Sequence, residues 1–207
     1  MEFTKESFVS NLYEVSKSQK DGRSVMSSRE QDKAVYHLDR VKDWFSDHYR
    51  NRAKMKSCDG FYQSNRDELV LEFKNTHHLK FKEFMGELEQ KMADTHMLLL
   101  ETFYRGEKVG KVATDVSLLV VYNDELSMGK GLCEIGDAMN RIKPLRGNQT
   151  RTSKPPALYT EDEFRQEADR VGKKYQDGFY KDVSFMDKKD FCEMYVEQGY
   201  FAGPLKG

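Results

Sequence analysis

An aspartate and a Glu-x-Lys tripeptide have the residue types and the spacing for phosphodiester chemistry. Asp59 precedes the tripeptide Glu72-Phe73-Lys74 by thirteen residues. Leu69 to Lys74 is rich in β-forming residues, and residues i and i+2 of a strand point the same way, so Glu72 and Lys74 share one face. Charges inside an apolar strand are costly unless they are paired, solvated or bound to a metal ion. The pattern therefore predicts a polar cluster on this face, to which Asp59 adds a second carboxylate.

Two carboxylates and a lysine suit the hydrolysis of a phosphodiester bond. Mg²⁺ is typically held by one or two carboxylates, and it polarises a phosphoryl oxygen and activates water. A lysine beside the ion can orient the water or stabilise the developing negative charge. The alternative for Glu72 and Lys74 is an ion pair on an exposed sheet face, and for Asp59 it is a turn residue before Gly60.

The sequence resembles the PD-(D/E)xK nuclease superfamily in the residues Asp59, Glu72 and Lys74 and in the order of the elements around them. The resemblance covers about residues 28–122. The resemblance implies a restriction-endonuclease-like core made of a helix, a three-strand meander, a helix and a further strand. It also implies that Asp59 and Glu72 bind Mg²⁺ or Mn²⁺ and that Lys74 serves the attacking water. The expected function is therefore a metal-dependent nuclease acting on DNA or RNA.

Three further residues bear on this resemblance. A glutamate from the first core helix often joins such metal sites, and Glu30 is the nearest candidate, although a capping box with Ser27 also accounts for it. Cys58 stands where the superfamily name implies proline. The superfamily includes members that keep the fold after losing activity, so a silent member stays open as an alternative.

Contacts with nucleic acid must be local, because 34 Lys and Arg residues are balanced by 35 Asp and Glu residues, for a net charge of −1. His77 and His78 follow the predicted strand, and adjacent histidines can supply a metal ligand or a phosphate contact. The alternative for them is a polar loop between strand and helix. A second basic excess runs from Arg141 to Lys154. The alternative for these runs is a solvated charged face. The first basic run, at alternate spacing just before Asp59, consists of Arg50, Arg52, Lys54 and Lys56.

Hydrophobic periodicity predicts the elements that position these residues. The apolar run over 116–122 is typical of a central strand covered on both faces. Arg146 to Pro156 indicates a loop or linker. Two further predicted strands, 58–63 and 69–74, form a hairpin. Helices are predicted over 5–17, 28–49, 79–100 and 132–142, and two more are predicted to begin after the capping residues Thr160 and Asp187.

This order predicts an α/β fold with a mixed central sheet flanked by helices. We expect a core with an N-terminal helix over residues 1–146 and a C-terminal helical extension over 158–207, which can pack on the core as one domain. If its aromatic residues are exposed, the extension favours a second function, a protein-binding module such as an immunity protein or an antitoxin that caps a toxin. Those residues are Phe179, Tyr180, Tyr195, Tyr200 and Phe201.

The sequence also predicts a cytoplasmic protein. It has no apolar run of the roughly 18 to 20 residues that a membrane helix needs. The N-terminal residues lack the pattern of a secretory signal. Cys58, Cys133 and Cys192 are far apart with no CxxC pair, which predicts three free thiols in a reducing compartment.

Overall fold

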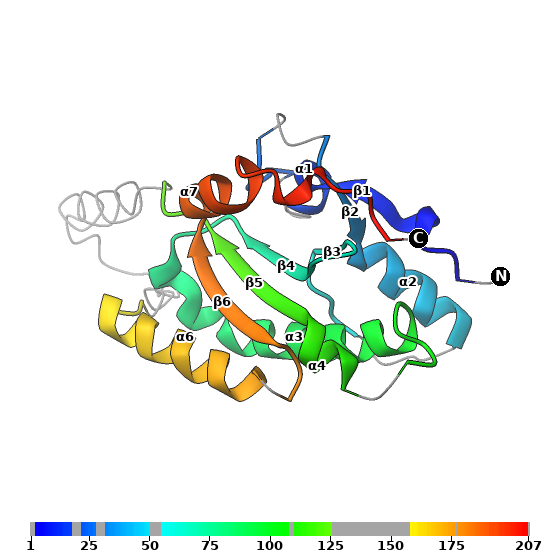
Figure 1. Cartoon of the computed structure of the whole chain (residues 1–207). Helices are drawn as coiled ribbons and strands as arrows, with labels where there is room; N and C mark the ends of the chain where they lie inside the picture. The colour runs from blue at the N-terminus through cyan, green and yellow to red at the C-terminus, as the bar shows by residue number, and fades with distance from the viewer. Residues whose placement is uncertain are drawn as a thin grey trace, which may run out of the picture.

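The structure, a computed structural model, describes residues 3–17, 22–27, 32–49, 55–107, 110–125, 158–176 and 178–206. Within these ranges six strands form one open sheet in chain order, β1 to β6 (Figure 1). Neighbours from β1 to β4 are antiparallel, whereas β4, β5 and β6 are parallel. The strands are β1 Val9–Asn11, β2 Ala34–His37, β3 Gly60–Gln63, β4 Glu68–Lys74, β5 Val116–Tyr122 and β6 Asp182–Asp187.

Helices cover both faces of the sheet. In Figure 1, α3, α4 and α6 lie below the sheet, and α1 and α7 lie above it. The α-helices are α1 Leu12–Val15, α2 Leu38–Tyr49, α3 Met85–Glu101, α4 Lys111–Asp115, α6 Glu161–Tyr175 and α7 Lys188–Phe191. The 3-10 turns are η1 Lys5–Phe8, η3 His78–Glu83 and η5 Tyr200–Ala202, and a π-helical turn, η4, spans Cys192–Val196.

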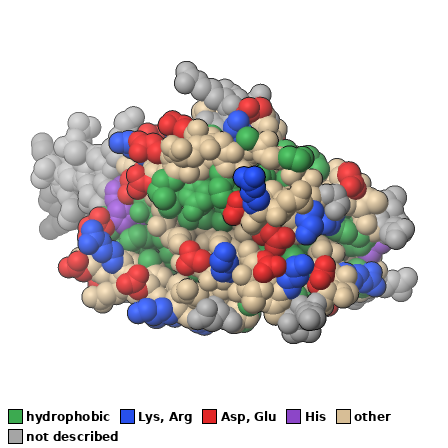
Figure 2. Space-filling model, in the orientation of Figure 1, with side chains coloured by type: hydrophobic (Ala, Val, Ile, Leu, Met, Phe, Trp, Pro, Cys, Tyr) green, Lys and Arg blue, Asp and Glu red, His purple; other side chains and the backbone are tan. Residues whose placement is uncertain are grey.

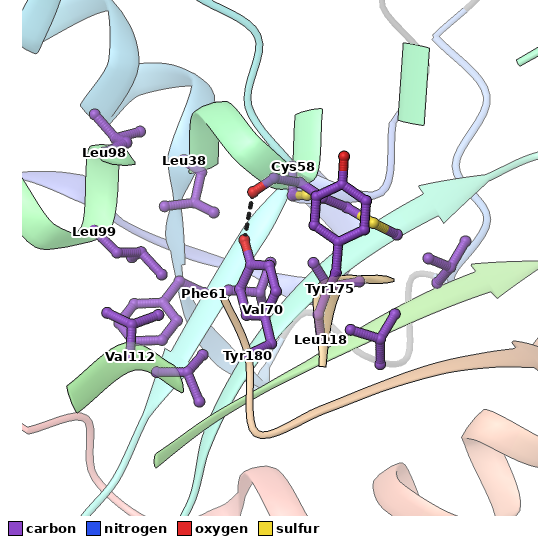
Figure 3. Close-up of a cluster of buried hydrophobic side chains, with 14 of the residues drawn as sticks. Leu38, Cys58, Phe61, Val70, Leu98, Leu99, Val112, Leu118, Tyr175 and Tyr180 are labelled. Atoms are coloured by element: carbon purple, nitrogen blue, oxygen red, sulfur yellow. Dashed lines mark hydrogen bonds between the residues drawn. The ribbon is translucent and has the colours of Figure 1, made fainter. Parts of the chain in front are cut away.

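The larger apolar core lies between the sheet and the layer that contains α2, α3 and α6. Figure 3 shows side chains from these helices and from β3, β4 and β5 meeting in this core. Tyr180 is fully buried there, and its hydroxyl donates a hydrogen bond to the carbonyl oxygen of Met92 (2.8 Å). Because its polar end is satisfied, this large ring can lie wholly within the core.

Several expected elements are confirmed. The hairpin is β3 and β4, and the apolar run over 116–122 is β5, which lies between β4 and β6 with both faces covered. The helix expected over 79–100 is α3, preceded by the turn η3. Thr160 forms a complete capping box at α6, and Asp187 caps α7 by accepting a hydrogen bond from the Lys189 N–H.

Two expected helices are wrong in part. Residues 5–17 form η1, the short strand β1 and α1, because Val9–Asn11 pairs with β2 and Asn11 then caps α1. The helix expected over 28–49 begins only at Leu38. Ala34–His37 is a strand instead, because it completes the ladder between β1 and β3 and buries Val35 and Tyr36 on opposite sides.

The C-terminal segment is not only helical, since Asp182–Asp187 pairs with β5 as the edge strand β6. Tyr180 and Phe201 are buried, so two of the five aromatic residues expected at a partner surface belong to the core. The expected helix over 132–142, the loop over 146–156 and Cys133 lie outside the described residues, and Cys58 is a free thiol. No helix in the described part of the chain is long and apolar enough to cross a membrane.

Candidate functional site

Strand register brings Asp59 and Glu72 together. Gly60 pairs with Leu71 in the antiparallel ladder of β3 and β4, so the preceding residue, Asp59, lies opposite Glu72. The Asp59 N–H donates to the carbonyl oxygen of Leu71 (2.9 Å), and the Phe73 N–H donates to Asp59 Oδ2 (2.6 Å). These two bonds hold the Asp59 carboxylate at the edge of β4, beside the Glu72 side chain.

Two lysines surround the fully buried Glu72 carboxylate. Lys74 Nζ lies 2.9 Å from Glu72 Oε1. Lys91, which projects from α3, donates to Oε1 (2.8 Å) and Oε2 (3.0 Å) of Glu72, and its Nζ lies 3.5 Å from Asp59 Oδ1. The expected alternative, an ion pair between Glu72 and Lys74, is therefore present, but it is buried and does not lie on an exposed sheet face, because the Glu72 side chain has 0% exposure.

The cluster perturbs the protonation of its members. Burial, together with the nearby Glu72 carboxylate, raises the pKa of Asp59 to about 7. Burial by itself would lower the pKa of Lys91, but the attraction of Asp59 and Glu72 outweighs it and raises that pKa above its ordinary value. Lys91 is therefore a permanent cation, and it neutralises much of the charge of the two carboxylates.

The cluster forms part of the wall of a groove of about 830 Å³. Asp39, in the first turn of α2, also lines this groove, and its carboxylate accepts hydrogen bonds from Ser57 Oγ (2.8 Å) and Lys42 Nζ (2.7 Å). Burial tends to raise the pKa of Asp39, but these two bonds outweigh it and lower that pKa. The groove thus carries, besides Asp59, a carboxylate that stays ionised. Its polar lining includes His37, Asp39, Lys56, Asp59, Lys74 and Lys91.

Helix α3 also fixes the chain that leads into Asp59. The Lys56 N–H donates to Asp94 Oδ2 (2.9 Å), and the Cys58 N–H donates to Thr95 Oγ1 (2.8 Å). Cys58 is buried, and this burial raises the pKa of its thiol. The residue at the expected proline position is therefore an unreactive packing residue.

The oxygen atoms of this cluster suit a hard divalent ion. Carboxylate oxygens are the ligands that Mg²⁺ and Mn²⁺ prefer. The ammonium of Lys91 already lies where the carboxylates of Asp59 and Glu72 converge, which shows that a cation is stabilised at this point. An ion that binds both carboxylates has to displace this ammonium.

Of the other expected site residues, the structure describes only Lys56 and His77. Lys56 lines the groove, and its Nζ lies 3.6 Å from Glu87 Oε1. His77 contacts Asp124 instead, with 3.6 Å between Nδ1 and Oδ1. The expected metal ligand Glu30 and the expected phosphate contacts Arg50, Arg52 and Lys54 lie outside the described residues, as does the second basic segment over 141–154.

Sequence reasoning missed Lys91 and Asp39. The sequence signal for Lys91 is its position on the buried face of α3, three residues after Leu88 and four before Thr95, both of which are buried. A charged residue on the buried face of a helix needs a buried partner. Asp39 was missed because the sequence placed the start of its helix about ten residues too early.

Comparison of the chain with protein-family models, with curated proteins and with solved structures found no match.

Proposed function

We propose that this chain is a divalent-metal-dependent nuclease with a restriction-endonuclease-like core of the PD-(D/E)xK type. Its metal ligands are Asp59 and Glu72, its metal is Mg²⁺ or Mn²⁺, and its substrate is DNA or RNA. The observation that carries the proposal is that Asp59, Lys74 and Lys91 line one wall of a groove and that both lysines contact Glu72, which is buried behind that wall.

The order of elements around the cluster supports the proposal. The hairpin of β3 and β4 carries Asp59 and Glu72, and α3 then leads to β5, which lies parallel to β4. With β2 before them, these strands give a meander followed by a helix and a further strand. One difference is that α2 lies between β2 and β3 in the chain.

Each residue of the cluster has a distinct task in the proposed reaction. Asp59 and Glu72 supply anionic oxygens, and the backbone bonds of Asp59 orient its carboxylate. Lys74 lines the groove beside Glu72, so its ammonium can hold the attacking water or the developing negative charge. A bound divalent ion would supply the polarisation of the phosphoryl group.

The second candidate is a catalytically silent nuclease-fold protein that binds a protein partner, such as an immunity protein or an antitoxin. Lys91 favours it, because its ammonium already compensates both carboxylates without a metal ion. The burial of Tyr180 and Phe201 counts against it, because it removes two aromatic residues from the expected partner surface.

Cleavage assays test the proposal. Labelled single-stranded and double-stranded DNA and RNA are incubated with the protein and Mg²⁺ or Mn²⁺. We expect cleavage of at least one substrate, and we expect Lys74→Ala to reduce the rate about 10²- to 10³-fold. The control is Lys189→Ala, at a side chain that is 71% exposed, which should cleave like the wild type.

Two results would contradict the proposal. One is the absence of metal-dependent cleavage by the wild type on all four substrates. The other is cleavage that survives Lys74→Ala unchanged, which would assign the activity to another site.

A further inference from the structure

A second polar cluster lies where β4 and β5 end. His77 and His78 follow β4, and Asp124 follows β5. One ligand atom from each of the three residues lies within 4.8 Å of the other two. His78 Nδ1 is 2.7 Å from Asp124 Oδ2, and His77 Nδ1 is 3.6 Å from Asp124 Oδ1. Consecutive histidines thus turn their Nδ1 atoms toward the same carboxylate.

The backbone builds this arrangement. Because β4 and β5 are parallel and in register, with Lys74 opposite Tyr122, the residues after both strands emerge side by side. The His78 N–H donates to Asp124 Oδ1 (3.0 Å), and the Asp124 N–H donates to Asp187 Oδ1 at the end of β6 (3.1 Å). The cluster therefore rests on the carboxyl ends of three parallel strands, where open α/β sheets bind ligands.

Glu161 provides an outer contact to the cluster. Its Oε2 lies 2.5 Å from His78 Nε2, the ring nitrogen that faces away from Asp124. A carboxylate in this position fixes the orientation of the ring, as outer contacts of metal-binding histidines usually do. Nδ1 lies against the Asp124 carboxylate, so a metal ion would have to enter between these two groups. His78 itself is buried, which fixes the orientation of its ring.

The carboxylates of the cluster favour the binding of a cation. Among the described residues, Asp124 and Glu161 form ion pairs only with His77 and His78, and neither pairs with a lysine or an arginine. The cluster therefore holds two carboxylates, the partly buried one of Asp124 and the more exposed one of Glu161. This differs from the Asp59 and Glu72 cluster, where two lysines balance the carboxylates.

We propose that His77 Nδ1, His78 Nδ1 and Asp124 form a binding site for a transition-metal ion of the Zn²⁺ class. Two imidazoles and one carboxylate select Zn²⁺ and similar ions over Mg²⁺, which prefers oxygen alone. The three ligand atoms lie within 4.8 Å of one another, and the side chains have to adjust around an ion to reach bond lengths of about 2.0 to 2.2 Å. Three protein ligands leave the fourth position open. A cavity of about 600 Å³, lined by His78, Asp124, Glu161 and Arg165 among others, lies beside it.

The test uses Co²⁺ as a spectroscopic substitute for Zn²⁺, with full-length protein that carries no histidine tag. Co²⁺ bound by nitrogen and oxygen ligands in a four-coordinate site absorbs visible light strongly. We expect one equivalent of Co²⁺ to produce this absorption and one equivalent of Zn²⁺ to abolish it by displacement. His77→Ala and Asp124→Asn should each weaken the binding at least tenfold, and circular dichroism should confirm that both variants are folded.

Two controls separate this site from the proposed nuclease site and from chance binding. Glu72→Gln should leave the Co²⁺ spectrum unchanged, because Glu72 belongs to the other cluster. His48→Ala, which removes an exposed histidine on α2, should also leave it unchanged. If the wild type shows no such absorption, or if the absorption survives both His77→Ala and Asp124→Asn, the metal site is wrong and the cluster is only a hydrogen-bonded network.

Discussion

At the scale of single residues, Lys91 explains how two carboxylates lie together between the sheet and α3. Its ammonium contacts both Glu72 and Asp59, and Glu72 is fully buried. An uncompensated carboxylate in this position would be strongly destabilising, because its lost hydration would not be replaced. The same ammonium competes with any divalent ion for the two carboxylates, so metal binding by the wild type should be weak.

Replacing Lys91 should destabilise the metal-free protein and tighten metal binding. Lys91→Met removes one partner of a buried ion pair, which typically costs about 3 to 5 kcal/mol of unfolding free energy. Added Mg²⁺ should then raise the melting temperature of Lys91→Met more than that of the wild type. Lys80→Met, at an exposed position, is the control. Equal effects of Mg²⁺ on Lys91→Met and on the wild type would contradict metal binding at this pair.

Asp59 should make stability depend on pH. Its pKa rises from an ordinary value of 3.8 to about 7 in the folded protein, chiefly through burial. Between these values the unfolded chain has lost a proton that the folded protein still holds, so stability falls as the pH rises from about 4 to 7. Asp59→Asn removes this titration, and urea unfolding at several pH values should show a slope shallower by up to about 1.4 kcal/mol per pH unit. Parallel curves for the two proteins would refute the assignment.

At the scale of secondary structure, α3 fixes the cluster through three side chains. Lys91 contacts Glu72 of β4, while Asp94 and Thr95 accept the backbone hydrogen bonds of Lys56 and Cys58. These contacts determine where the chain enters β3 and hence where Asp59 lies. The position of the site therefore depends on side chains from one helix.

Thr95 allows this dependence to be measured. Thr95→Val keeps the size of the side chain but leaves the buried Cys58 N–H without an acceptor, which should cost about 1 to 3 kcal/mol of unfolding free energy. Metal-dependent cleavage should also fall, because Asp59 loses its fixed position. Thr114→Val, at an exposed threonine of α4, should change neither quantity. Wild-type stability in Thr95→Val would mean that this hydrogen bond does not hold the segment.

Sequence patterns identified the elements with strong local signals and missed those that depend on neighbours. The apolar run of β5 and the capping box of α6 were predicted correctly because each signal lies within a few residues. β2 was mistaken for the start of a helix. β6 was missed because it is a short edge strand with an aspartate at each end, so its sequence shows only a weak strand pattern. Lys91 joins the site through the packing of α3 on β4, nineteen residues from Glu72 in sequence. Its position on the buried face of α3 indicates a buried partner but does not identify that partner.

At the scale of the whole molecule, charge is evenly mixed. On the face shown in Figure 2, acidic and basic side chains are interspersed over the surface. With a net charge of −1, the protein has no overall attraction for nucleic acid, so phosphate contacts have to come from local groups.

The basic segment before Asp59 should provide such contacts. Replacing Arg50, Arg52, Lys54 and Lys56 together by Ala should weaken nucleic-acid binding and make its salt dependence shallower, because each lost phosphate contact removes about 0.7 to 0.9 from the slope. Fluorescence anisotropy with a labelled oligonucleotide at several salt concentrations measures both quantities. Unchanged affinity and slope would assign the segment to a solvated face.

The two proposed metal sites require different ions, and this difference allows the nuclease site to be tested alone. Asp124→Asn weakens the proposed histidine site, so this variant serves as the background. The electron paramagnetic resonance signal of free Mn²⁺ then reports binding at the Asp59 and Glu72 pair. We predict one Mn²⁺ bound in the millimolar range or tighter, retained when Lys74→Ala is added and lost when Glu72→Gln is added. Absence of Mn²⁺ binding in the Asp124→Asn protein, or binding that Glu72→Gln leaves intact, would contradict the nuclease proposal.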